Sequence, residues 1–88
     1  MSYEVEIRDH LYRLFEKMRK TERRKLEIIN KKVVEISGNP YRYKPLKAPM
    51  QNMRCVHIAG SFVLIFSIDE KRKTITLEEF AHHDEAYR

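Results

Sequence analysis

Hydrophobic residues recur at helical spacing in two stretches of the first half of the chain. In residues 10–20 the apolar positions are Leu11, Leu14, Phe15 and Met18. In residues 22–37 they are Leu26, Ile29, Val33 and Ile36. Asp9 and Thr21 precede the two stretches and are residue types that favour helix N-caps, and Gly38 follows the second stretch where a left-handed helix end is common. The pattern predicts a helical hairpin that turns at Lys20-Thr21.

The rest of the chain has the pattern of β-strands. Residues 61–68 are dominated by β-branched and aromatic residues that do not alternate cleanly with polar ones, which indicates a strand buried on both faces. Residues 54–58 predict a neighbouring strand, and residues 74–78, which alternate with period two, pair back across a charged turn at 69–73. Residues 3–7 alternate apolar and acidic, which predicts a short half-buried strand. The order indicates an α+β domain in which the hairpin covers one face of an antiparallel meander.

Length and composition fit a single domain over residues 1–88. The one cysteine, Cys55, excludes a disulfide framework within the chain and a multi-cysteine zinc site, and we expect it to be a small buried apolar residue. No apolar run approaches the length of a membrane span, so we expect a cytoplasmic protein with no membrane partner.

Positive charge is concentrated in the first two-thirds of the chain. Residues 8–32 hold ten Lys and Arg against four acids, within a total charge of +5. This excess indicates a polyanionic partner, of which nucleic acid is the commonest. A solvated helical surface explains the same charge equally well.

The loop at residues 39–53 holds all three prolines and interrupts both periodicities. In it, basic residues alternate with aromatic ones: Tyr41, Arg42, Tyr43, Lys44 and Lys47. Such a pattern suits phosphate contact combined with base stacking. Tyrosines that anchor the loop on the core would give the same pattern, and both interpretations remain open at this point.

Four short motifs, taken in order along essentially the whole chain, resemble the RelE/ParE superfamily of bacterial and archaeal type II toxins. They are Lys44-Pro45-Leu46, Arg54-x-x-His57-Ile58, the run Phe62-Val63-Leu64-Ile65-Phe66, and His83-x-x-x-Tyr87. The resemblance is greatest to the YafQ branch. It implies a RelE-like fold and a metal-independent mRNA interferase, an endoribonuclease that cuts messages in the ribosomal A site. It also implies a RelB-like antitoxin that holds the toxin inactive.

The resemblance also implies the site. His57 and His83 match family histidines implicated in cleavage, and Lys44 stands where the YafQ branch has a histidine. Tyr87 stands where that branch has a phenylalanine and RelE has a functional tyrosine, and Phe62 keeps an aromatic ring at the branch's tryptophan position.

The chain also departs from the family pattern. Ser61 replaces an acid, Glu79 replaces an arginine, and RelE's strand arginine has no counterpart after Gly60.

Cleavage of RNA without a metal requires a base for the 2′-OH proton, an acid for the leaving 5′-oxygen, and cations for the phosphorane. The candidate catalytic residues are His57, His83, Tyr87 and Lys44, and the candidate RNA- or phosphate-binding residues are Lys47, Arg54, Arg42 and Phe62. Arg54 and His57 are three positions apart, so on a strand they face opposite sides unless a bulge intervenes.

The four histidines can also be interpreted without a catalytic role or a metal in mind. Taken without the resemblance, His57 would be a hydrogen-bonded packing residue, and His10 is expected to be structural. His82 is expected to face solvent while His83 faces the cleft. We expect no metal and no other cofactor, because adjacent ligands without a spaced partner form a poor zinc pattern.

Two other functions fit the same sequence. One is a ParE-like toxin that inhibits DNA gyrase by binding and cleaves nothing, although the clustered histidines favour a nuclease. The other is an RNA-binding relic without catalytic activity.

Overall fold

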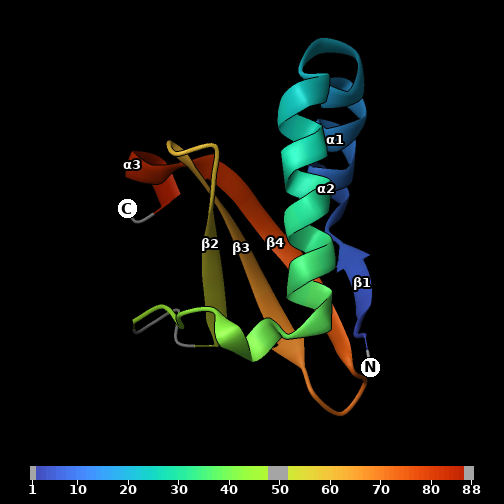
Figure 1. Cartoon of the computed structure of the whole chain (residues 1–88), viewed down its shortest axis with the longest axis vertical. Coiled ribbons are helices and arrows are strands. Elements are labelled where there is room, and N and C mark those ends of the chain that lie inside the picture. Colours follow the sequence, from blue (N-terminus) through green and yellow to red (C-terminus); the bar gives the residue numbers. More distant parts are fainter. Residues whose placement is uncertain (1, 48–51, 87–88) are drawn as a thin grey trace.

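The computed structural model describes residues 2–47 and 52–86 of the chain (Figure 1). Its elements are β1 (Glu4–Ile7), α1 (Asp9–Thr21), α2 (Arg23–Gly38), the short 3-10 helix η1 (Pro40–Arg42), β2 (Met53–Ile58), β3 (Phe62–Asp69), β4 (Thr74–His82) and the single-turn α3 (His83–Ala86). The predicted α+β order of strand, helical hairpin and meander is confirmed. The last strand is four residues longer than predicted, because its pairing continues to Phe62↔His82.

The four strands form one sheet in the order β1-β4-β3-β2. β2, β3 and β4 make the predicted antiparallel meander, and β1 lies parallel to β4 at the edge. Residues 3–7 were expected to form a half-buried strand. A strand does form over Glu4–Ile7, but its predicted burial was wrong, because all four of its residues are exposed. At the edge of the sheet β1 has a neighbouring strand on one side, and Val5 and Ile7 are 38% and 36% exposed.

The hairpin of α1 and α2 packs on one face of the sheet, which we call the helix face (Figure 1). The core there consists of Leu11, Met18, Ile29, Ile36, Val56, Ile58, Leu64, Phe66, Ile75 and Leu77. Because side chains alternate along a strand, Val63 and Ile65 lie on the opposite face, which we call the far face. All four residues 63–66 are buried, which confirms the prediction of a strand buried on both sides. No helix of the described part of the chain has the length and apolarity that a membrane span requires.

The helix ends differ from the sequence prediction. Arg8, in extended conformation, occupies the N-cap of α1, and Asp9 is instead the first helical residue, where the helix dipole favours an acid. Thr21 is the last residue of α1, and its hydroxyl donates to the carbonyl of Lys17 at 3.0 Å. Gly38 does not adopt a positive φ. The N–H of Asn39 caps α2 by donating to the carbonyls of Glu35 and Ile36, so no left-handed residue is needed.

A hydrogen-bonded cluster around Glu70 joins three distant segments. The hydroxyls of Tyr3 and Tyr41 donate to Glu70 Oε1 at 2.7 and 2.8 Å, and Lys73 Nζ donates to the other oxygen. The hydrogen bond from Lys73, followed by those from the tyrosines, lowers the pKa of Glu70 from 4.5 to about 2. The cluster therefore ties the N-terminus and η1 to the β3–β4 turn.

We expect this cluster to make the stability of the fold depend on acid pH. Because the pKa of Glu70 is lower in the folded chain, its stabilising effect is present above pH 4.5 and is lost as pH falls toward 2. Thermal denaturation should give a lower midpoint for Glu70→Gln at neutral pH, and the difference from the unmodified chain should shrink toward pH 2. Two parallel curves of midpoint against pH would contradict this assignment.

Candidate functional site

The structure brings His57 and His83 together. Their rings are stacked, with centroids 5.6 Å apart and planes at 18°. His57 lies on β2 opposite Val63, which places it on the far face. His83 opens α3, and its N–H donates to the carbonyl of Ser61 at 2.8 Å. Both imidazoles are exposed, so a substrate can reach the pair from solvent.

The neighbouring residues His82 and Asp84 have different surroundings. The ring of His82 meets Phe62 edge-on at 5.6 Å, on the side of the helix face. The carboxylate of Asp84 lies 3.8 Å from Nδ1 of His83 and 3.9 Å from Nδ1 of His82. Asp84, which the sequence analysis did not single out, is thus placed to pair with His83 when that ring is protonated. Its position directly after His83 is the only indication that the sequence offers.

Lys44 lies on the same face of the sheet as the histidine pair. Residues 44–46 run along the outer edge of β2, with an antiparallel bridge between Pro45 and Arg54. The N–H of Cys55 donates to the carbonyl of Lys44 at 3.4 Å. Residues opposite each other in an antiparallel pair share a face, so Lys44 lies beside Cys55 on the far face, one alternation from His57. Cys55 is half-buried and not fully buried as predicted, because it lies on the far face of β2, the outer strand of the four-stranded sheet.

The structure does not place Arg54 with the histidines. Its Nη1 donates to the carbonyl of Tyr43 at 2.5 Å, and its guanidinium lies 5.1 Å from the ring centre of Tyr41. The ring of Tyr43 packs edge-on against Phe66 at 5.9 Å. Arg54 and His57 therefore face opposite sides, as their odd spacing predicts in a strand without a bulge between them. These contacts favour the interpretation that the two tyrosines anchor the loop.

Phe62 also lies on the helix face. Its ring stacks on Phe80 at 5.3 Å, and the ammonium of Lys25 lies 4.2 Å from its centre. Arg42 is exposed in η1. Its neighbour Tyr41 is hydrogen-bonded to Glu70 in the β3–β4 turn, and this turn lies at the opposite end of the sheet from His57. Lys47 is exposed in the loop. The predicted site residue Tyr87 lies outside the described residues.

A polar cluster that the sequence did not predict lies further along the far face. The pairing of β3 and β4 shifts between Ile65 and Phe66, and this bulge leaves Glu78 without a partner in the register. Arg8 donates to both oxygens of Glu78 at 2.9 and 3.3 Å, and Ser67 Oγ donates to Glu78 Oε2 at 2.6 Å. Partial burial acts to raise the pKa of Glu78, but the hydrogen bonds from Arg8 and Ser67 hold it below its usual value. The only indication in the sequence is the consecutive pair Glu78-Glu79, which breaks the alternation of β4.

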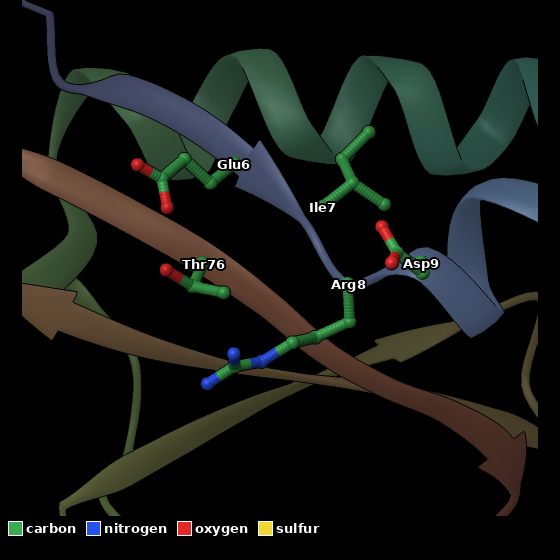
Figure 2. Close-up of a pocket in the computed structure, with 5 residues that line it drawn as sticks. All are labelled: Glu6, Ile7, Arg8, Asp9 and Thr76. Carbon is green, nitrogen blue, oxygen red and sulfur yellow. The ribbon is translucent and has the colours of Figure 1, made fainter.

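Beside this cluster is a hollow of about 190 Å³ lined by Glu6, Ile7, Arg8, Asp9 and Thr76. Figure 2 shows Arg8 extending across β4, away from Ile7, which points toward a helix. The hollow offers two carboxylates and a guanidinium that Glu78 already binds. No group of three potential metal ligands occurs among the residues that the structure describes. The histidine pair with Lys44 is therefore the better candidate for acid–base chemistry.

Two curated proteins match the chain over nearly its whole length. A protein of Methanocaldococcus jannaschii described as putative toxin RelE4 is 43% identical over 86 residues, which are 98% of this chain and 92% of that protein. An uncharacterized protein of Methanosarcina mazei is 51% identical over 85 residues, which are 97% of this chain and 99% of that protein. No family model matches the chain.

Two solved structures have the same fold. The toxin–antitoxin complex RelBE2 from Mycobacterium tuberculosis contains a chain that matches with a TM-score of 0.78 and 21% identity, over 94% of this chain and all of that one. A mutant of the E. coli toxin RelE in the free state matches with a TM-score of 0.73 and 18% identity, over 99% of this chain and 88% of that one. At these identities the likeness shows the fold.

Proposed function

The chain belongs to the RelE-like toxin superfamily, and on this premise we propose that it is a ribosome-dependent mRNA endoribonuclease of a type II toxin–antitoxin system. The observation that carries the proposal is the stacked pair of His57 and His83 on the exposed far face. Histidine titrates near neutrality, so two adjacent imidazoles can serve as base and acid for one phosphate.

In the proposed reaction, one imidazole removes the proton of the 2′-OH, and the 2′-oxygen attacks the adjacent phosphorus. The other imidazole donates a proton to the 5′-oxygen as its bond to phosphorus breaks. Lys44, from the segment that borders β2, stabilises the negative charge on the phosphorane. By family resemblance, Tyr87 contributes from the end of the chain.

The other candidate residues take supporting roles in this proposal. Lys47 and Arg42 are exposed and contact the RNA away from the scissile phosphate. Arg54 holds the loop that carries Lys44, because its guanidinium binds Tyr43 and Tyr41. Phe62 supports α3 through its edge contact with His82.

We further propose that a short, acidic, RelB-like antitoxin neutralises the chain. The M. tuberculosis structural neighbour is a complex of toxin and antitoxin. In this chain Val34 and Tyr12 are 71% and 58% exposed, and the edge strand β1 also presents Val5 and Ile7. A partner that adds a helix or a strand to these surfaces would bury at least about 1,600 Å². In the proposed complex it also masks residues 83–87.

Incubation of the purified chain with messenger RNA tests the proposed activity. We expect cleavage of message bound in ribosomes and at most slow cleavage of the same message free in solution. DNA gyrase supercoiling, measured in parallel, should be unaffected. Gyrase inhibition without cleavage would instead support a ParE-like toxin, and RNA binding without cleavage would support an inactive relic.

A further inference from the structure

The turn between α1 and α2 holds a hollow lined only by cations. Its volume is about 580 Å³, and the residues that line it are Arg19, Lys20 and Arg23. Figure 1 shows this turn at one extreme of the molecule, beyond the end of the sheet. α1 has 13 residues and starts where Arg8 is bonded to β4, so its last turn lies about 20 Å from that anchor.

The acids near this turn are already paired at the sides of the helices. Glu16 approaches Arg19 at 3.5 Å, and Glu22 accepts from Lys25 at 2.6 Å. Residues 16–25 hold six Lys and Arg against these two acids, so the turn keeps a net positive charge. Among the residues that the structure describes, no acid lines the hollow itself.

Fold stability does not account for all of these cations. Arg19 and Lys20 are in the last turn of α1, where the helix dipole favours positive charge. Arg23 is the first residue of α2, whose first turn contains no acid, and the dipole disfavours positive charge there. A residue that breaks a local stability rule without a structural gain is a candidate for function.

We propose that Arg19, Lys20 and Arg23 form a binding site for the phosphate backbone of structured RNA, and that this site holds the toxin on ribosomal RNA while the far face cuts the message. The choice of ribosomal RNA as the partner rests on the proposed function. Two arginines and a lysine converging on one hollow can donate several hydrogen bonds to phosphate oxygens, and Arg does so in a two-pronged manner. An anionic membrane surface is a poorer fit, because the hollow has no apolar side chain to insert among lipids.

A binding measurement on ribosomes without message tests this site separately from catalysis. The probe is purified message-free ribosomes, and the variant is Arg19→Gln/Lys20→Gln/Arg23→Gln in the full chain. A matched control removes the same charge from three exposed positions elsewhere, with Arg13→Gln/Lys31→Gln/Lys71→Gln. Thermal midpoints check folding, and Arg23→Gln alone should leave the midpoint unchanged or higher, because it removes an unfavourable charge.

We expect the hairpin variant to bind ribosomes at least tenfold more weakly at physiological salt. The slope of log Kd against log salt should fall by about two to three, which corresponds to three phosphate contacts. The control should lower the slope by less than one. Equal losses in the two variants would overturn the proposal, as would a full salt slope in the hairpin variant. Either result holds whether or not the unmodified chain cleaves message, so failure of this site and failure of the proposed activity are distinguishable.

Discussion

Replacing His83 by alanine should lower the rate of message cleavage on the ribosome by about a hundred- to ten-thousand-fold, the usual cost of losing a general acid or base. The fold should persist, because the ring of His83 is exposed and the hydrogen bond from this residue to the carbonyl of Ser61 comes from the backbone N–H. Cleavage of a defined message in single-turnover conditions measures the effect, with circular dichroism as the folding check.

His82 provides a matched control for this experiment. Its side chain is 47% exposed, against 48% for His83, but its ring contacts Phe62 and not His57. His82→Ala should therefore change the rate by much less. His57→Ala should resemble His83→Ala, and the double variant should be little worse than either, because residues that act as a unit are not additive. Equal rates for His82→Ala and a folded His83→Ala would exclude His83 from the chemistry.

The elements of the fold could be predicted from sequence where periodicity is strong. The apolar stripes gave both helices, and the unbroken run in residues 61–68 gave a strand buried on both sides. The parallel pairing of β1 with β4 could not be predicted, because it depends on contacts between residues about 70 positions apart. The bulge at Glu78 could not be predicted either, because a bulge is a property of the pairing between two strands and not of one strand alone.

The site could be predicted only in part. The pairing of His57 with His83 follows from the meander, in which β2 and β4 lie on either side of β3 and residue 83 at the end of β4 binds the Ser61 carbonyl in the β2–β3 turn. Lys44 lies on the same face because residues 44–46 run antiparallel to β2. The sequence did not predict this contact, because the loop contains prolines and interrupts both periodicities. The sequence offered Lys44 as a candidate catalytic residue and Arg54 as a candidate phosphate-binding residue. The structure places Lys44 on the far face and Arg54 on the helix face, and this separation has a testable consequence.

Replacing Lys44 by alanine should lower the cleavage rate about a hundred- to a thousandfold, the typical loss when one stabilising donor is removed from a developing anion. The midpoint of unfolding should change little, because Lys44 is hydrogen-bonded to β2 through its backbone carbonyl, which the substitution leaves in place. Lys44→Arg should restore part of the rate, since it returns the positive charge with a different shape. Rates measured at saturating ribosome concentration separate this effect from weaker binding.

Arg54→Ala is the contrasting variant. It removes the guanidinium that binds the Tyr43 carbonyl and covers Tyr41, so it should cost about 1–3 kcal/mol of stability. At a temperature where the variant remains folded, the cleavage rate should fall less than for Lys44→Ala, because Arg54 acts through the position of the loop. A larger loss of rate for Arg54→Ala than for Lys44→Ala, with both variants folded, would mean that Arg54 reaches the phosphate. The helix-face position of Arg54 would then have to change when RNA binds.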